Sequence, residues 1–317
     1  MEQRANRLFL VIPCYNEEAV LKETAQQLLK KYHTLQNNGI ISSDSKICFV
    51  NDGSNDHTWD IIRSLHLENP TYTGLSLTRN RGHQNALLAG LLTVMEQADI
   101  VISMDADLQD DIQTIDAMLS AYQEGNEIVY GVRSDRRTDT FFKRFSAESF
   151  YHLLQIMGVE IIYNHADFRL MSKKALQGLS EFQETNLFLR GIIPLIGYKS
   201  TTVAYERHER FAGKSKYPLT KMISLAFDGI TSLSIRPIRI ISNLGILISI
   251  ISLLFLIWSI FTHYFGYTVD GWTSLLASIW LVGGLEMLSL GVIGEYIGKI
   301  YNETKRRPRY IIEEYLD

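Results

Sequence analysis

Two long apolar segments in the last third of the chain constrain its fold more than any other feature. Residues 240–261, IISNLGILISIISLLFLIWSIF, carry no charged side chain, and residues 272–293, WTSLLASIWLVGGLEMLSLGVI, carry only Glu286. About 20 consecutive apolar residues are enough to cross the hydrocarbon core of a bilayer. The two segments and their short connection therefore predict a transmembrane hairpin, and two buried helices of a soluble protein are the alternative.

Basic residues predict how this hairpin is oriented. The connection between the two segments contains no lysine or arginine. Basic residues lie before the first segment and after the second: Arg236, Arg239, Lys299, Lys305, Arg306, Arg307 and Arg309. By the positive-inside rule both termini face the cytoplasm of a multi-pass membrane protein. The apolar stretch near the N-terminus is too short for a signal peptide, which agrees with a cytoplasmic N-terminal part. Glycines between 283 and 298 allow close helix packing, which is compatible with a homo-oligomer.

Apolar residues recur at helical spacing in residues 218–237, immediately before the first apolar segment. Such a pattern is typical of an amphipathic helix that lies in the membrane interface. Packing of the same helix against the N-terminal domain would give the same pattern. We therefore expect a helix here and leave its surroundings open.

The composition excludes several classes of protein. Hydrophobic residues make up 46% of the chain and the formal net charge is -4, which excludes wholesale disorder and gives no support for nucleic-acid binding. The only cysteines, Cys14 and Cys48, lie in or beside apolar strand-like runs. Their number and spacing exclude a disulfide framework and a CxxC metal site.

Residues 1 to about 215 alternate strand-like and helix-like segments, which predicts an α/β domain with a mostly parallel sheet covered by helices on both faces. Ligands of such sheets bind beyond the carboxyl ends of the strands. Polar segments follow the four N-terminal strands that we expect: 13–17, 52–56, 79–84 and 105–111. We therefore expect a binding site at this edge of the sheet.

The chemistry of this site is narrowed by the motifs. The chain has no GxxxxGKS loop, no GxGxxG fingerprint and no GxSxG elbow, so the usual support for P-loop hydrolysis, hydride transfer and serine hydrolysis is missing. Asp105 and Asp107 offer the hard oxygen ligands that Mg²⁺ or Mn²⁺ prefer, although Asp-x-Asp alone also fits an ordinary loop. We expect Asp110 and Asp111 to cap the helix that follows.

Together, six motifs resemble family 2 glycosyltransferases of the GT-A fold. They are PCYNEEA at 13–19, NDGSNDHT at 51–58, LTRNRGHQNAL at 77–87, MDADLQDD at 104–111, ADFRLMS at 166–172 and ERFAGKSKYPL at 209–219. More narrowly, the chain resembles polyprenyl-phosphate hexosyltransferases, which include dolichol-phosphate mannose synthase and bacterial undecaprenyl-phosphate glucosyltransferases with two C-terminal membrane helices. With the predicted hairpin, the resemblance covers nearly the whole chain.

The resemblance implies inverting transfer of a hexose, preferably glucose from UDP-glucose, to undecaprenyl or another polyprenyl phosphate on the cytoplasmic face of the cell (inner) membrane. The acceptor phosphate is already anionic, so catalysis would depend on positioning and charge stabilisation. The implied ligands of Mg²⁺ or Mn²⁺ are Asp105, Asp107 and Gln109. The resemblance does not determine which sugar and which nucleotide the donor contains, partly because Asn51 occupies a position where the family often has aspartate.

The resemblance also assigns the other site residues. Implied for the nucleotide sugar are Pro13, Tyr15, Asn16, Glu17, Asp52, Arg79, Gln84, Asp105, Ala106, Arg210 and Lys216. Implied for catalysis are Asp107, Asp167, Arg133 and Arg144, of which the two arginines would bind the acceptor phosphate. Other interpretations remain for some: a solvated turn for Arg79 and Gln84, a buried ion pair of Asp167 with Arg169, and lipid headgroup contacts for Lys214 and Lys216.

These expectations divide the chain into a cytosolic GT-A domain at 1–215, an interfacial amphipathic helix at 216–237, a transmembrane hairpin at 238–298 and a cytosolic basic tail at 299–317. A processive polysaccharide synthase is the second hypothesis, but ETNLFLRGII at 184–193 lacks the expected QxxRW-type motif. A non-catalytic membrane scaffold is the third, and the intact Asp105, Asp107, Arg133 and Arg144 argue against it.

Overall fold

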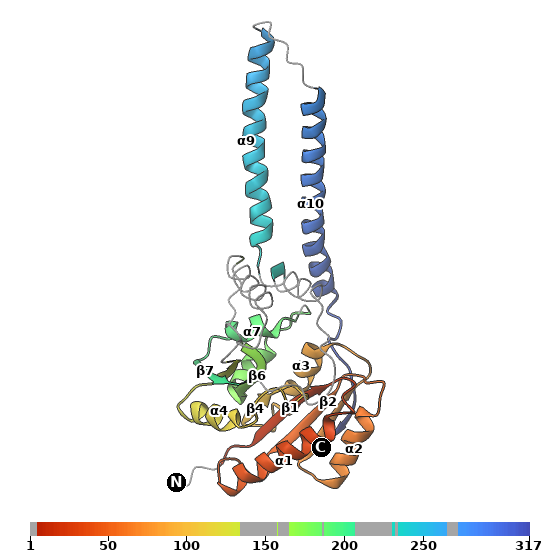
Figure 1. Cartoon of the computed structure of the whole chain (residues 1–317), viewed down its shortest axis with the longest axis vertical. Helices are drawn as coiled ribbons and strands as arrows, with labels where there is room; N and C mark the ends of the chain where they lie inside the picture. The colour runs from red at the N-terminus through yellow and green to blue at the C-terminus, as the bar shows by residue number, and fades with distance from the viewer. Residues whose placement is uncertain are drawn as a thin grey trace.

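A mixed β-sheet lies at the centre of the N-terminal domain in the computed structural model (Figure 1). The structure describes residues 5–133, 157, 165–185, 187–206, 230–231, 234–264 and 272–317. Across these residues the strand order is β7-β5-β6-β4-β1-β2-β3-β8. Two long helices leave the domain on one side and run next to each other, away from the sheet.

The centre of the sheet is parallel, as the sequence predicts. Its strands are β1 (Leu8–Cys14), β2 (Lys46–Asn51), β3 (Tyr72–Leu77) and β4 (Ile100–Ser103). β1 pairs with β2 and β4, and β2 pairs with β3, all in parallel register. Every residue of β1 is buried, because helices cover both faces and an apolar run without alternation suits a strand in that position.

Alternate residues of β1 point to two separate cores. Leu8, Leu10 and Ile12 pack with α1 (Leu21–Asn37), α2 (Thr58–Glu68) and α4 (Thr114–Gln123). Phe9 and Val11 pack with α3 (His83–Val94), α6 (Lys173–Ser180) and α7 (Leu189–Leu195) on the other face. The helices therefore form layers above and below the sheet, and the carboxyl ends of the parallel strands stay open between them.

The remaining strands make the sheet mixed rather than mostly parallel. β6 (His165–Ser172) runs antiparallel to both β4 and β5 (Ile128–Arg133), while β7 (Ser200–Tyr205) pairs with β5 in parallel. In the described chain, four of the seven pairings are parallel. The prediction of a helix-covered α/β sheet is confirmed, and the antiparallel strands β6 and β8 (Ile312–Leu316) are the features that it missed.

The two long helices are α9 (Arg236–Tyr264) and α10 (Trp272–Lys305). Among the residues described, one segment, Leu281–Lys305, is long and apolar enough to cross a membrane. Large apolar residues are exposed on both helices, for example Leu254 and Met287, the latter 71% exposed. Most of the predicted interfacial helix, residues 216–229, lies outside the described residues, as do residues 265–271 of the connection.

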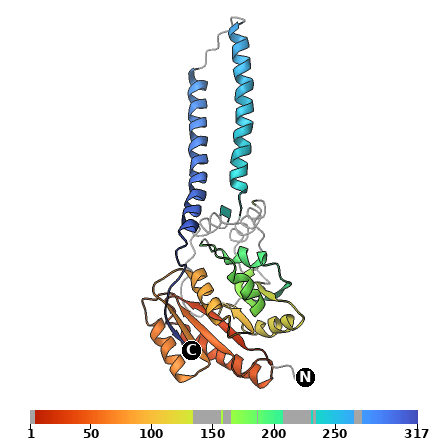
Figure 2. The same ribbon diagram turned by 180° about the vertical axis from the view of Figure 1, so that it is seen from behind.

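The C-terminal residues return to the sheet. β8 (Ile312–Leu316) runs antiparallel to β3 and forms the last strand at that edge (Figure 2). Tyr315 packs against the core that contains α3, and Arg63 forms an ion pair with Glu314. This strand lies in the stretch that the sequence predicted to be a basic tail, because pairing with a strand more than 200 residues earlier leaves no local signal.

Candidate active site

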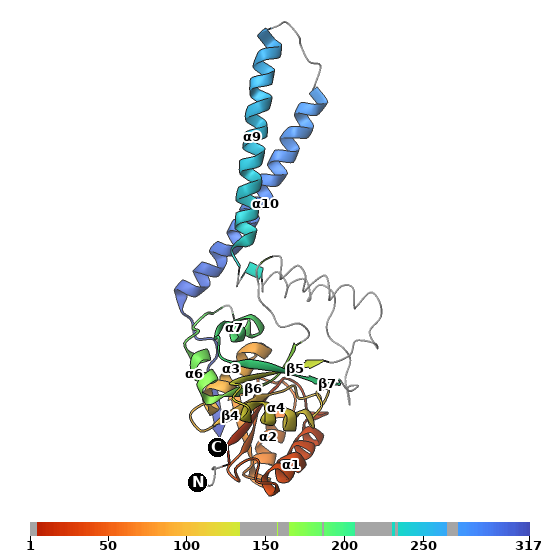
Figure 3. The same ribbon diagram turned by 90° about the vertical axis from the view of Figure 1, so that its left-hand side faces the viewer.

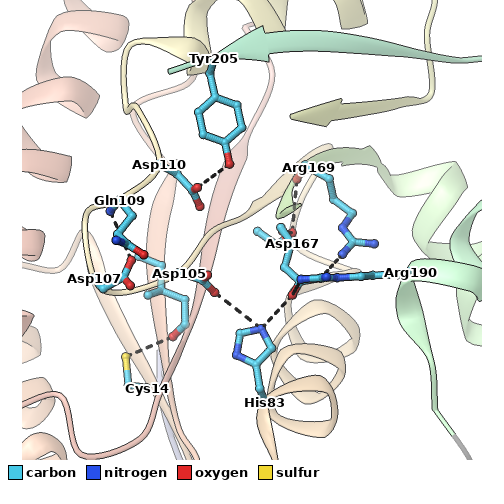
Figure 4. A network of polar contacts seen from close by, with 12 residues as sticks. Cys14, His83, Asp105, Asp107, Gln109, Asp110, Asp167, Arg169, Arg190 and Tyr205 are labelled. Atoms are coloured by element: carbon cyan, nitrogen blue, oxygen red, sulfur yellow. Dashed lines mark hydrogen bonds and ion pairs between the residues drawn. The ribbon is translucent and has the colours of Figure 1, made fainter. Parts of the chain in front are cut away.

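The loop after β4 carries the predicted metal ligands and is held in a tight conformation (Figure 4). The Oδ1 atom of Asp107 accepts a hydrogen bond from the backbone N–H of Gln109 at 3.2 Å. Leu108 between them has a φ of 56°, in the left-handed region that is costly for a branched side chain. Strained backbone of this kind gathers at functional sites, which agrees with a binding role for the loop.

Asp110 does not cap a helix, contrary to the prediction. Its side chain is buried, and its Oδ1 accepts a 2.5 Å hydrogen bond from the hydroxyl of Tyr205 at the end of β7. Burial, aided by the nearby Asp105, raises the pKa of Asp110 to about 6. Asp111 does contribute to the turn before α4, because its Oδ1 accepts from the backbone N–H of Gln113 at 2.9 Å.

Arg133 extends the contact between Asp110 and Tyr205. It ends β5, next to β7 in the sheet, and its Nε donates to the Tyr205 hydroxyl at 3.4 Å. The guanidinium, the phenol and the carboxylate thus form one chain of polar contacts beside the loop of Asp105 and Asp107. Arg133, predicted to bind the acceptor phosphate, lies at the same edge of the sheet as the predicted metal ligands.

Asp167 on β6 is the centre of a second set of charged contacts (Figure 4). Its Oδ1 accepts from Arg169 Nη2 at 2.6 Å, and Arg190 on α7 donates to both carboxylate oxygens at 3.3 and 3.1 Å. Burial opposes ionisation of this carboxyl, but Arg190, His83 and Arg169 hold its pKa well below its usual range. Asp167 is therefore an anion at neutral pH.

His83 lies between the two acidic groups. Its Nε2 is 3.4 Å from Asp167 Oδ2 and 3.6 Å from Asp105 Oδ1, and its ring is 39% exposed. Burial opposes the charged imidazolium, yet the hydrogen bond to Asp167 and the charge of Asp105 raise the pKa of His83 to about 8. A cationic imidazole therefore joins the loop after β4 to β6.

The three cationic partners differ in their access to a ligand. Arg169 is 1% exposed, and its Nε and Nη1 have no hydrogen-bond partner among the residues described. This burial supports the alternative interpretation for Arg169, a structural ion pair, over contact with a substrate. The side chains of Arg190 and His83 are more accessible, with 35% and 39% of each exposed.

The loops after β1 and β2 are bonded to each other. Asn16, with a φ of 55°, accepts from the backbone N–H of Asn55 at 2.9 Å and donates its own N–H to Ser54 Oγ at 3.0 Å. The backbone N–H of Glu17 donates to Thr58 Oγ1 at 2.9 Å. Tyr15 remains 40% exposed, so its ring is available for stacking on a base. Pro13 belongs to the same edge of the sheet, at the end of β1.

Asp52 fixes the loop after β3. Its two carboxylate oxygens accept from the backbone N–H groups of Arg81 at 2.6 Å and Gly82 at 2.9 Å, and the side chain is buried. Each carboxylate oxygen can accept more than one hydrogen bond, and the contact of Asp52 with a base stays a prediction. Arg79, in the same loop, lines a cavity of about 430 Å³ with Trp59 and Glu313.

Two further residues that were predicted to bind the nucleotide sugar form hydrogen bonds within the protein. The side-chain oxygen Oε1 of Gln84 accepts from the backbone N–H of Leu189 at 2.8 Å, so this residue joins α3 to α7. Ala106 is buried, and its carbonyl accepts from Thr24 Oγ1 at 2.8 Å. Four predicted residues lie outside the described residues: Arg144, Arg210, Lys214 and Lys216.

The donor set after β4 fits a divalent cation by its chemistry. Asp105, Asp107 and Gln109 supply hard oxygen atoms from one loop, and Mg²⁺ is commonly held by one or two carboxylates with phosphate and water oxygens. The described residues contain no cluster of three or more histidine, cysteine or acidic side chains that could hold a metal ion by themselves. A bound diphosphate would therefore have to complete such a site.

Comparison with known proteins agrees with this architecture. Residues 9–179 match the sequence model of glycosyl transferase family 2, and the chain belongs to this family. It is 52% identical to the uncharacterized glycosyltransferase YkoT of Bacillus subtilis, over 99% of this chain and 93% of that protein. It is 40% identical to the prophage bactoprenol glucosyl transferase homolog of Escherichia coli, over 97% of this chain and 98% of that protein.

Among solved structures, mannosyl-3-phosphoglycerate synthase from Rubrobacter xylanophilus matches part of the chain. It is 16% identical to the chain, with a TM-score of 0.49, and the match covers 74% of each chain. The family model and the relatives over nearly the whole chain confirm the family predicted from the six motifs, and the chain is a glycosyltransferase by family.

Proposed function

We propose that this glycosyltransferase moves glucose from UDP-glucose to undecaprenyl or another polyprenyl phosphate at the cytoplasmic face of a membrane. The observation that carries the proposal is the similarity over almost the full length to relatives named bactoprenol glucosyl transferases, which are 40% identical over 97% of this chain. This similarity includes α9 and α10 as well as the sheet domain. Similarity restricted to the catalytic domain would not indicate which acceptor the protein uses.

In the proposed reaction an oxygen of the acceptor phosphate attacks the anomeric carbon of glucose. The bond from this carbon to the diphosphate breaks, UDP leaves, and the configuration inverts. The acceptor oxygen is already anionic, so the protein is not required to supply a strong base. Its residues have to bring the two substrates together and stabilise the charge that develops on the leaving group.

The residues of the site divide between these tasks. Asp105, Asp107 and Gln109 would hold Mg²⁺ or Mn²⁺, which when bound offsets negative charge on the diphosphate. Arg133 and Arg144 are the proposed contacts of the acceptor phosphate, to which a guanidinium can donate two hydrogen bonds. Asp167, ionised and fixed by Arg190, is proposed to orient the sugar or the acceptor through its carboxylate.

The proposed membrane arrangement follows from α9 and α10. We propose that both helices cross the cell membrane as a hairpin, that both termini are cytoplasmic, and that residues 216–237 lie at the interface. Leu281–Lys305 supports one span by length and composition, and the exposed apolar side chains of α9 support the second. The domain of residues 1–215 would then stand at the depth of the lipid phosphate, with β8 added to its sheet.

A transfer assay tests the proposal. Purified full-length protein in detergent is incubated with undecaprenyl phosphate, Mg²⁺ or Mn²⁺ and a panel of radiolabelled nucleotide sugars, and label is counted in the lipid phase. We expect label from UDP-glucose, and none when the lipid acceptor is omitted. A folded preparation that transfers no sugar from any donor would overturn the proposed function, and transfer from another donor would overturn the assignment of glucose.

A further inference from the structure

The last turn of α10 is bonded to the catalytic domain. Glu303 accepts hydrogen bonds from the backbone N–H of Thr185 at 2.6 Å and from its hydroxyl at 3.2 Å. Beyond the helix, Arg309 donates to the carbonyl of Phe182 at 3.0 Å. Figure 3 shows α10 descending to the side of the domain where α6 and α7 lie. The helix that contains the candidate membrane span is therefore attached to the chain just before α7.

The segment that is bonded to α10 continues into the candidate active site. The backbone N–H of Leu189 is held by Gln84 at 2.8 Å, and Arg190 donates two hydrogen bonds to Asp167. Thr185 and Arg190 are only five positions apart in the sequence. One short stretch of chain is thus bonded to α10 through Thr185 and to the carboxylate of Asp167 through Arg190.

We propose that Glu303 is a positioning residue, which acts through Thr185 to hold Arg190 against Asp167. Hydrogen bonds from a backbone N–H to a carboxylate are charge-assisted and stronger than neutral ones, so Glu303 fixes the backbone at Thr185. Arg190 needs such support because its side chain is 35% exposed and has freedom to leave Asp167. The placement of a charged group in the site thereby depends on the end of α10.

This inference rests on the proposed function for its kinetic effect, but its structural part is independent of that function. If Glu303 acts only through Arg190, substitution of Glu303 does not lower kcat/KM further in a variant that already lacks Arg190. If Glu303 merely stabilises the fold, the effects of the two substitutions on kcat/KM are additive. A double-mutant cycle separates these cases.

The kinetic test uses Glu303→Ala, Arg190→Ala and the double variant in the transfer assay. Misplacement of a group in the site costs on the order of tenfold to 100-fold in rate, so we expect Glu303→Ala to lower kcat/KM within this range. We expect the double variant to equal Arg190→Ala. Glu181→Ala is the matched control, since it removes an exposed carboxylate from the same part of the chain and should leave the rate unchanged. Additive losses would overturn the proposal.

A second readout needs no transfer activity. Hydrogen exchange followed by mass spectrometry is measured on peptides that cover residues 187–195. Exchange should be faster in Glu303→Ala than in wild type or Glu181→Ala, and unchanged exchange would overturn the inference even where transfer is observed. If Glu303→Ala does not fold, Thr185→Val removes only the hydroxyl bond, and it should change exchange and rate in the same direction; no change in either would overturn the proposal.

Discussion

The hydroxyl of Tyr205 donates a 2.5 Å hydrogen bond to Oδ1 of Asp110, which joins the end of β7 to the loop of the candidate metal ligands. Oδ2 of the same carboxylate has no hydrogen-bond partner among the described residues. Tyr205→Phe should therefore leave a buried carboxylate poorly satisfied and lower the free energy of unfolding by about 1–3 kcal/mol. Chemical unfolding in detergent micelles measures the change.

The control for this variant is Tyr198→Phe. The ring of Tyr198 contacts the ammonium group of Lys174, and this contact does not involve the hydroxyl. We expect a change within about 0.5 kcal/mol. Equal stability of Tyr205→Phe and wild type would show that the contact with Asp110 contributes nothing to the fold.

The buried carboxyl of Asp52 makes stability depend on pH. Burial raises its pKa above the ordinary 3.8, and the hydrogen bonds from Arg81 and Gly82 oppose this only in part. A raised pKa means that the folded state binds the proton more tightly. This contribution to stability is complete below pH 3.8 and is lost as the pH rises through the raised pKa.

Asp52→Asn tests this sign. The variant lacks the titrating group, although it also loses one acceptor at every pH. The free energy of unfolding of wild type minus that of the variant should therefore fall as the pH rises from about 4 to 7. A difference that grows with pH over this interval would show that the pKa is lowered.

Asp107→Ala should abolish metal-dependent binding of the nucleotide sugar. The substitution removes one of the two carboxylates proposed to hold Mg²⁺ or Mn²⁺, and few ligands remain in the loop. Asp111→Ala is the comparison, because among the described residues the hydrogen bond of the Asp111 carboxylate goes to the turn before α4. Calorimetric titration with UDP-glucose, with and without metal, measures both. Full metal-dependent binding by Asp107→Ala would refute the proposed ligand set.

β8 should be held mainly by packing. Tyr315 contacts the core that contains α3, and Tyr315→Ala should lower the free energy of unfolding by about 2 kcal/mol or more. Glu314→Gln should have no measurable effect, because its ion pair with Arg63 is half exposed to solvent. A larger loss in Glu314→Gln than in Tyr315→Ala would reverse this ranking.

The local pattern of the sequence predicted the first half of the domain well. β1 to β4 are short apolar runs that end in turn residues, and the helices between them have apolar faces, so neighbours along the chain determine their structure. The site loops followed from this order, because parallel strands bring their carboxyl ends to one edge. The position of Asp105 and Asp107 in the loop after β4 followed for the same reason, and their role as metal ligands stays a prediction.

Contacts between segments that are far apart in the chain could not be predicted from local sequence patterns. The direction of β6 depends on its pairing with β4 and β5, and β8 depends on β3. Asp110 resembles a helix cap in sequence, yet its partner Tyr205 lies 95 residues away. His83 and Arg190 were missed as site residues because each meets Asp167 only in the folded domain, and a lone histidine or arginine gives no local signal.

The pairing of β8 with β3 also has a consequence for biosynthesis. The ribosome delivers this strand after α9 and α10, so β3 is already made while the segments that leave the domain are still being synthesised. Until then the edge of β3 has unpaired backbone groups, which can recruit other chains. Completion of the sheet thus waits until β8 has been synthesised, and a nascent chain halted after α10 carries an unpaired edge strand that is prone to aggregation.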